Sequence, residues 1–322
     1  MKAIIYREYG SPDVLRYEDI EKPAPGAGEV LVRVRMSSVN PIDWHLMRGL
    51  PYFLRLITGP RRPKSSKLGV DVAGEVERVG SGVTLFKAGD AVFGGCFSAF
   101  AEYVSVRESN LVLKPDNVTF AQAGCVAVAA LTALQGLRDK GQIRPGQKVV
   151  INGAAGGVGT FAVQIAKSFG AEVTGICSTR NVDMVRSIGA DVVIDYTRED
   201  FTSGTQRYDI IFDCIGNHSL TAVRRILNRN GRHVAVGGPT SAWMIGAIAH
   251  TFAAAALSRL TRRKFLPILG KLRKEDLALI GELMASGKIK PVIDRRYSLR
   301  ETPEAVRYLE EGHARGKVII TV

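Results

Sequence analysis

A glycine-rich run between an apolar strand and a helix is the segment best suited to chemistry. Residues 147–152 form an apolar strand, and apolar residues recur over 158–169 at the spacing of one buried helical face. Free backbone N–H groups and the helix dipole at such a junction favour an anion. Gly156 would let the backbone approach a pyrophosphate, and Gly159 would let the helix pack closely on the strand. The turn, with Ala154 in place of the usual first glycine, therefore predicts a dinucleotide site.

A glycine turn also occurs as plain packing, so the residues after it matter. They alternate between predicted strands at 172–177, 191–194, 208–213 and 232–236 and a helix at 182–187. This alternation is typical of an α/β fold with a doubly wound parallel sheet, which binds ligands at the carboxyl ends of its strands. The further candidate cofactor-binding residues there are Gly157, Val158, Cys214, Ile215, Gly216, Gly237 and Gly238.

The end of the second predicted strand indicates which nicotinamide cofactor fits. A site for NAD expects Asp or Glu about 20 residues past the turn, whereas a site for NADP avoids that charge and offers donors to a 2′-phosphate. Here the strand is followed by Ser178, Thr179 and Arg180, with no carboxylate. The Arg180 guanidinium suits phosphate, and Tyr196 adds a hydroxyl. We predict NADPH as cofactor; the alternative is that Arg180 is a solvated residue at a helix start.

Length and composition indicate a protein of two domains. The chain has 322 residues, more than one hydrophobic core usually supports. Its four cysteines include no C-x-x-C pair, so neither a disulfide framework nor a zinc knuckle is expected. The sequence shows no secretory leader and no run of about 18 uncharged apolar residues, which predicts a cytoplasmic protein.

The first part of the chain has a different pattern of predicted secondary structure from the middle. Short β-like runs alternate there with turns that contain glycine and proline, which predicts a barrel-like, β-rich domain. Strands are predicted again at 291–297 and 317–322, so we expect the C-terminal tail to return to this domain. The expected domains are 1–121 completed by 288–322, and a nucleotide-binding domain at 122–287.

Four motifs resemble those of one enzyme family. They are Ser38-Val39-Asn40-Pro41-Ile42-Asp43, Leu68-Gly69-Val70-Asp71-Val72-Ala73-Gly74, the turn at 152–159, and Arg315-Gly316-Lys317-Val318-Ile319. The chain resembles the zinc-independent medium-chain dehydrogenases/reductases, in the quinone oxidoreductase branch with zeta-crystallin and the reticulon-interacting-protein-like reductases. The resemblance implies a GroES-like β-barrel completed by the C-terminal tail, a Rossmann domain, a nicotinamide in the cleft between them, and a homodimer.

Three positions separate the chain from the zinc enzymes of that family. Zinc alcohol dehydrogenases place a cysteine near position 38 and a His-Glu pair near 70 and 71, where this chain has Ser38, Val70 and Asp71. The four-cysteine loop of the structural zinc is reduced to Cys96. Without a Lewis acid, hydride transfer remains feasible to acceptors that are already electrophilic. We therefore expect no metal, and NADPH-dependent reduction of a quinone or an α,β-unsaturated carbonyl.

The resemblance also implies roles for single residues. Asn40, Asp43 and Tyr52 are candidate catalytic residues near the nicotinamide and the substrate, with a turn at Asn40 and a helix cap at Asp43 as the structural alternatives. Thr132 and Lys317 match family residues close to the cofactor. Their alternatives are packing for Thr132 and an ordinary exposed lysine for Lys317.

Two basic stretches account for much of the formal net charge of +13. The first, at 51–68, contains no acidic residue, and the second, at 259–274, follows a mostly apolar run at 242–257. An apolar run with a cationic flank resembles a helix that docks on anionic lipid, which would make the protein a peripheral membrane protein. The alternatives are that the run covers the substrate or makes a dimer contact.

Two other functions stay open beside the reductase. One is a zinc-free alcohol or aldehyde dehydrogenase-reductase. The other is an RNA-binding or crystallin-like structural protein with weak catalysis, because positive charge attracts nucleic acid. No aromatic platform for RNA bases is visible, so we expect a small electrophilic substrate rather than nucleic acid as partner.

Overall fold

The chain divides into two compact units. The structure, a computed structural model, describes residues 1–236, 258–259 and 261–322. Unit 1 comprises Met1–Leu131, Leu272–Gly287 and Pro291–Val322, and unit 2 comprises Thr132–Lys271 and Lys288–Lys290. The predicted binding residues Gly237 and Gly238 and the apolar run at 242–257 lie outside the described residues.

Unit 1 is built around a sheet with the strand order β14-β15-β3-β4-β5-β7, in which β6 also pairs with β3. The pair β14–β15 is parallel and the other pairs are antiparallel. A small sheet pairs β1 (Lys2–Ile5) with β2 (Arg16–Asp19). The strands of the large sheet are β3 (Glu29–Val39), β4 (Asp71–Val79), β5 (Ala91–Gly95), β6 (Tyr103–Arg107), β7 (Leu111–Leu113), β14 (Ile293–Ser298) and β15 (Lys317–Thr321).

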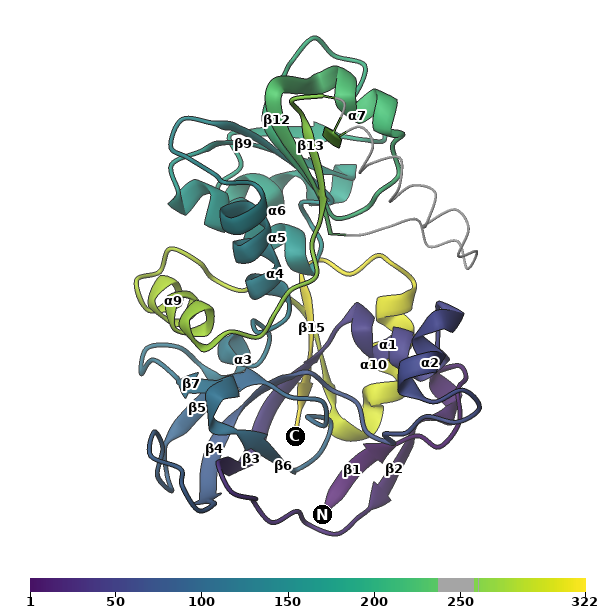
Figure 1. Cartoon of the computed structure of the whole chain (residues 1–322), viewed down its shortest axis with the longest axis vertical. Coiled ribbons are helices and arrows are strands. Elements are labelled where there is room, and N and C mark those ends of the chain that lie inside the picture. The colour runs from purple at the N-terminus through teal and green to yellow at the C-terminus, as the bar shows by residue number, and fades with distance from the viewer. Residues whose placement is uncertain (237–257, 260) are drawn as a thin grey trace. The chain divides into compact units, whose positions relative to one another are not determined.

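The helices of unit 1 cover parts of this sheet. They are α1 (Pro41–Arg48), α2 (Arg55–Thr58), α3 (Phe120–Ala123), α9 (Lys274–Ala285) and α10 (Thr302–Glu310). In Figure 1, α10 lies beside α1, and the side chains of Arg48 and Glu310 form an ion pair between these two helices (2.5 Å).

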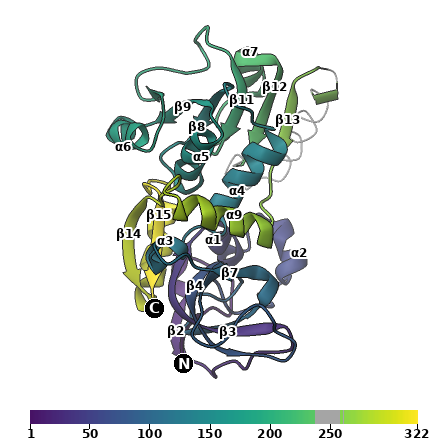
Figure 2. The same cartoon turned by 90° about the vertical axis from the view of Figure 1, so that its left-hand side faces the viewer.

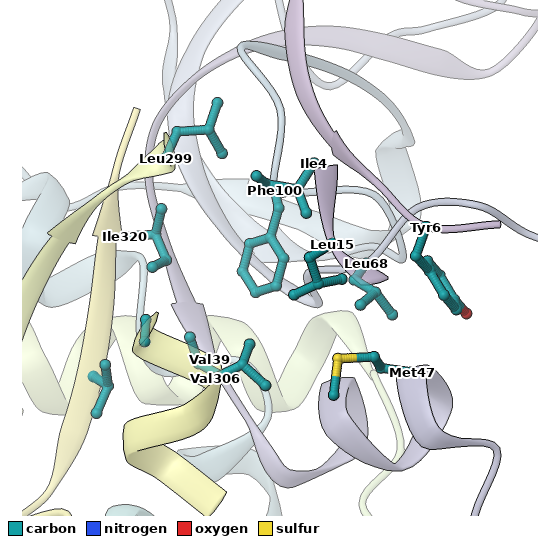
Figure 3. Packing of buried hydrophobic residues seen from close by; sticks show 12 residues of the cluster. Ile4, Tyr6, Leu15, Val39, Met47, Leu68, Phe100, Leu299, Val306 and Ile320 are labelled. Atoms are coloured by element: carbon teal, nitrogen blue, oxygen red, sulfur yellow. The ribbon is translucent and has the colours of Figure 1, made fainter. Parts of the chain in front are cut away.

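One hydrophobic cluster shows why the C-terminal tail belongs to unit 1. Ile4 from the first strand, Met47 from α1 and Ile320 from the last strand share it with Phe100, which lies between β5 and β6 (Figure 3). Each of these four side chains is almost fully buried. Because burial of large apolar side chains is the main stabilising term in a core, the N-terminal and C-terminal segments stabilise each other.

Unit 2 is a parallel sheet with the strand order β10-β9-β8-β11-β12-β13 (Figure 2). Its strands are β8 (Lys148–Asn152), β9 (Glu172–Cys177), β10 (Val192–Asp195), β11 (Tyr208–Asp213), β12 (Leu227–Ala235) and β13 (Lys264–Pro267). Its helices are α5 (Gly157–Ser168), α6 (Val182–Ser187) and α7 (Leu220–Ile226), and α4 (Ala129–Gln135) leads into it from unit 1. The central strands β8 and β11 have apolar middles, residues 149–151 and 210–212, because helices cover both faces of such a sheet.

The limits of the units differ from those of the expected domains. Residues 122–131 and 272–287 lie in unit 1. Helix α3 contacts β3 and β4, and α9 contacts β7, so these segments bury their apolar faces against the barrel strands. Among the described residues, no helix is both long and apolar enough to cross a lipid bilayer.

Candidate functional site

The glycine turn of unit 2 joins β8 to α5. Gly153 adopts a φ of +82°, a value that glycine tolerates best. Gly153 therefore makes the sharp turn, one residue before Ala154, which the sequence aligned with the usual first glycine. Ala154 is buried and its N–H donates to the carbonyl of Ile176 on β9 (2.9 Å), so this N–H is used within the protein. The first turn of α5 carries the N–H groups that have no partner inside the helix.

Gly156 and Gly159 are glycines for different physical reasons. A Cβ placed on Gly159 would lie 2.0 Å from the carbonyl oxygen of Gly153, so only glycine allows α5 to approach the turn this closely. Among the residues that the structure describes, the atom nearest to a Cβ placed on Gly156 would be that same oxygen, at 3.5 Å. The packing of these residues therefore leaves space at Gly156, as expected for a position that faces a ligand.

A second turn, Cys214 to Gly216 after β11, lies beside the glycine turn. A Cβ on Gly153 would approach Ile215 Cδ1 to 2.8 Å. Asp213 holds this second turn, because its Oδ1 accepts the N–H of Ile215 (3.1 Å) and the N–H of Gly216 (2.8 Å). The structure thus brings together the predicted binding residues at the ends of β8 and β11.

Asp213 is a buried acid that the sequence analysis did not single out. Asn152 Nδ2 donates to its Oδ1 (2.8 Å), and His233 Nε2 lies 3.3 Å from its Oδ2. Burial opposes ionisation, but the hydrogen bonds from His233 and Gly216 bring the pKa of Asp213 below its ordinary value. Its position at the end of the apolar run 208–213 was the signal available in the sequence.

The end of β9 carries the predicted 2′-phosphate residues. Arg180 is exposed on the short 3-10 helix Thr179–Asn181, and the N–H of Tyr196 donates to the carbonyl of Cys177 (3.0 Å). Ser178 Oγ accepts a hydrogen bond from Asn181 Nδ2 (3.1 Å), while the buried Oδ1 of Asn181 has no hydrogen-bond partner among the described residues. A buried acceptor without a partner is uncommon, and here it lies beside the residues predicted to bind cofactor.

Thr179 and Thr132 have neighbours within unit 2. The Thr179 hydroxyl donates to Asp195 Oδ2 (2.5 Å), a carboxylate at the end of β10 that the sequence analysis did not consider. This hydrogen bond helps to lower the pKa of Asp195. Thr132 is nearly buried on α4, and a Cβ on Gly270 would lie 2.6 Å from its hydroxyl oxygen, so Thr132 packs against that glycine.

Unit 1 contains a buried polar network centred on Asp71. Ser38 Oγ donates to Asp71 Oδ2, and Asn40 Nδ2 donates to the same oxygen (2.9 Å). The other carboxylate oxygen, Oδ1, accepts the backbone N–H of Val128 (2.8 Å). The ammonium of Lys317 completes the network, with Nζ 2.6 Å from Asn40 Oδ1 and 3.4 Å from Asp71 Oδ2.

The strand register explains how residues so far apart in the sequence meet. Ser38 on β3 stands directly opposite Asp71 on β4. Val39 pairs with Val318 on β15, which brings Lys317 level with Asn40. The network therefore follows from the pairing of three neighbouring strands. The polar residues in otherwise buried strands were its signal in the sequence.

Asp43 lies beside this network rather than within it. Its Oδ2 accepts the N–H of Asn40 (2.8 Å), and its Oδ1 accepts the N–H of Gly69 (3.0 Å). Burial raises the pKa of Asp43 to about 7, against the effect of these two N–H donors, and the charge of Asp71 raises it further. The alternative of a helix cap is what the structure shows, because Asn40 and Asp43 form a capping box at the start of α1.

Two of the predicted residues, Lys317 and Tyr52, lie in different surroundings. Lys317 is not the exposed lysine of the alternative, because its side chain is buried among Val39, Asn40 and Asp71. Tyr52 is 62% exposed on the 3-10 helix Tyr52–Leu54, and its ring lies 5.0 Å from the Arg55 guanidinium. The structure thus unites Asn40, Asp43 and Lys317 but leaves Tyr52 outside their hydrogen bonds.

Comparison with known proteins decides the family. Residues 26–116 match the alcohol dehydrogenase GroES-like domain, and residues 188–320 match a family described as zinc-binding dehydrogenase. The chain is 33% identical to the chloroplast envelope quinone oxidoreductase homolog of Arabidopsis thaliana, over 99% of this chain and 98% of that protein. The chain belongs to the medium-chain dehydrogenase/reductase family. It falls in the quinone oxidoreductase branch and is an oxidoreductase.

Two further relatives of this medium-chain dehydrogenase/reductase are informative. The NADPH-dependent alkenal/one oxidoreductase of A. thaliana chloroplasts is 32% identical, over 99% of this chain and 79% of that protein. The structure of Escherichia coli quinone oxidoreductase complexed with NADPH is similar with a TM-score of 0.84 and 25% identity, over 100% of both chains. These similarities confirm the predicted fold class, a GroES-like unit and a Rossmann unit.

The residues present do not fit the zinc site that the name of one matching family implies. In the part of the chain that the structure describes, no group of three His, Cys, Asp or Glu side chains could hold a metal ion. The ammonium of Lys317 lies beside Ser38 and Asp71, where it would repel a second cation. Burial raises the pKa of Cys96 and of Cys125 to about 12, so without a metal ion both are neutral thiols near pH 7.

Replacement of Lys317 tests the buried network. We expect Lys317→Met to lower the free energy of unfolding by about 3–5 kcal/mol, because it leaves the Asp71 carboxylate buried without its cation. Chemical denaturation followed by tryptophan fluorescence measures the change. Adding Asp71→Asn removes the uncompensated charge and should restore part of the loss. Wild-type stability of the single variant, or no recovery in the double variant, would contradict this account.

Proposed function

We propose that this oxidoreductase transfers a hydride from NADPH to a quinone or to the β-carbon of an α,β-unsaturated carbonyl, without a metal ion. The choice of NADPH rests on the end of β9. The exposed Arg180 lies there, and no acidic residue follows Cys177 until Asp183. An arginine fork suits a 2′-phosphate, whereas NAD sites use a carboxylate at this place. NADPH, when bound, supplies the hydride.

Several features of unit 2 support a bound dinucleotide. The open space at Gly156 lies at the start of α5, where the helix dipole favours a phosphate, and a Cβ at this position would enter that space. The partnerless Oδ1 of Asn181 offers a buried acceptor beside Ser178 and Arg180, suited to a hydroxyl group. The NADPH-dependent alkenal/one oxidoreductase of A. thaliana and the E. coli quinone oxidoreductase complexed with NADPH support the same assignment.

The class of acceptor follows from the lack, in the described part of the chain, of residues that fit a zinc ion as Lewis acid. An unactivated carbonyl needs a Lewis acid or strong donors for the developing oxyanion, whereas a quinone or enone spreads the charge over its own π-system. The donor set around Asp71 does not fit zinc, so acceptors of the second kind are favoured. The names quinone oxidoreductase and alkenal/one oxidoreductase of the relatives agree with this choice.

A screen of acceptors tests the proposed reaction. NADPH oxidation is followed with 1,4-benzoquinone, but-3-en-2-one and butanal, after metal analysis of the same preparation. We expect turnover of the quinone and the enone, and a kcat/KM for the aldehyde at least about 100-fold lower, since a lost Lewis acid corresponds to several kcal/mol in the barrier. Stoichiometric zinc required for turnover, or equal activity on butanal, would refute the proposal.

Replacement of Arg180 tests the choice of cofactor. We expect Arg180→Ala to weaken NADPH binding by about 1.5–3 kcal/mol, the contribution of one hydrogen bond to a charged group, while NADH binding changes little. Fluorescence titration with both cofactors measures the two affinities. Arg186→Ala is the matched control, since Arg186 is an exposed arginine on α6 whose ion pair is with Asp183. Equal losses for NADPH and NADH would disprove the role of Arg180.

The two glycines of the turn form a matched pair of substitutions. Gly156→Ala should leave the thermal unfolding midpoint nearly unchanged but weaken NADPH by at least about tenfold, or 1.4 kcal/mol, because its Cβ enters the phosphate space. Gly159→Ala should lower the midpoint, because its Cβ would overlap the Gly153 carbonyl. Calorimetric unfolding and NADPH titration separate the two effects. Normal NADPH binding by the Gly156 variant would show that the phosphates lie elsewhere.

A further inference from the structure

Unit 1 contains a pocket of about 290 Å³, and Asp43 is the one residue of those discussed as candidate site residues that lines it. Its apolar wall includes Leu46, Leu68 and Val70. Leu68 also belongs to the core cluster drawn in Figure 3, so a rigid part of unit 1 forms this wall. Ile57 and Phe97 line the pocket too and are 72% and 66% exposed, which is unusual for such large apolar side chains.

Positively charged residues outnumber acidic residues around this pocket. Lys64 and Lys67 line it, and Arg61 and Arg62 lie in the same loop between α2 and β4. Within residues 1–236, 258–259 and 261–322, these four cations have no ion-pair partner, whereas Lys2, Lys22 and Lys167 in other parts of the chain each pair with an acid. The stretch 51–68 contains no acidic residue that could supply one.

The acidic residue that lines the pocket, Asp43, opposes an anion only weakly. Its carboxyl group is fully buried, and both of its oxygens accept backbone N–H groups. Burial also raises its pKa to about 7, so near neutral pH it carries less than a full negative charge. An incoming anion would therefore meet two lysines that no acid neutralises and an acid that is shielded from it.

We propose that this pocket binds the carboxylate end of the acceptor, so that the enzyme prefers electron-poor carbonyl compounds that carry a negative charge. Lys64 and Lys67 bind the carboxylate, and the apolar wall contacts the carbon chain. The inference rests on the proposed reduction of quinones or enones, and it names the class of acceptor that this reaction uses. Lys64 and Lys67 are specificity-determining residues in it and take no part in hydride transfer.

A pair of substrates that differ in charge tests the preference. The enone trans-4-oxopent-2-enoate is compared with its methyl ester in the wild type, in the double variant Lys64→Gln/Lys67→Gln, and in Lys87→Gln. Lys87 is an exposed lysine of unit 1 outside the pocket, so its variant shows the effect of removing a lysine charge elsewhere, one charge against the two that the double variant removes. Comparing variant with wild type for each substrate removes the difference in intrinsic reactivity between acid and ester.

We expect the double variant to lower kcat/KM for the acid by about tenfold and to leave the ester within about twofold, since two charge-assisted contacts are lost for the acid alone. The loss for the acid should shrink as ionic strength rises, because salt screens the lysines. Equal effects on acid and ester, or an equal loss in Lys87→Gln, would overturn the proposal.

A binding measurement separates the failure of this inference from the failure of the proposed function. Saturated 4-oxopentanoate and its methyl ester have no activated double bond, so calorimetric titration reports binding without turnover. In the double variant, the affinity for 4-oxopentanoate should fall by about the same factor as kcat/KM for the acid in the kinetic experiment, and the affinity for the ester should stay unchanged. If the wild type reduces neither enone, the proposed function fails. The titration still shows whether the pocket binds a carboxylate. Undiminished binding of 4-oxopentanoate by the double variant refutes the pocket proposal whatever the activity.

Discussion

The buried contact between the Lys317 ammonium and the Asp71 carboxylate is the interaction on which unit 1 depends. Charges removed from water are tolerated only when every polar atom near them finds a partner. Ser38, Asn40 and the N–H of Val128 supply those partners here. One cation thereby joins the last strand of the chain to two strands near its beginning. The same cation occupies the surroundings that a metal ion would need, so the structural solution also restricts the chemistry.

Under the proposed function, unit 2 meets a different requirement, because the ends of its strands must leave room for a dinucleotide without losing their shape. A buried acid fixes one turn through its backbone N–H groups, and a close contact between Gly159 and Gly153 fixes the other. Once both turns are rigid, the space at Gly156 need not be filled by the protein. Binding can then use a site that exists before the ligand arrives, which lowers the entropic cost of association.

Much of unit 2 could be predicted from the sequence because its order is local. The apolar runs at 172–177 and 208–213 coincide with β9 and β11, since buried parallel strands have a continuous hydrophobic signal. Strand β13 (Lys264–Pro267) was missed because it is short and lies among basic residues. The network of unit 1 could not be predicted, because the strand register that joins Lys317 to Asn40 depends on pairing between segments far apart in the chain. The resemblance implied a lysine close to the cofactor at 317, with an exposed lysine as the alternative, and the burial of Lys317 excludes the exposed lysine.

The position of β15 in the chain has a consequence for how the protein is made. The ribosome delivers Asp71 first, then the whole of the parallel sheet, and Lys317 only after that sheet. Until that last strand pairs with β3, the acid has no counter-ion and is better left in contact with water than enclosed. Unit 2 can complete its folding during translation, whereas unit 1 must wait for the final segment. The last strand thus determines when the first half of the protein becomes stable.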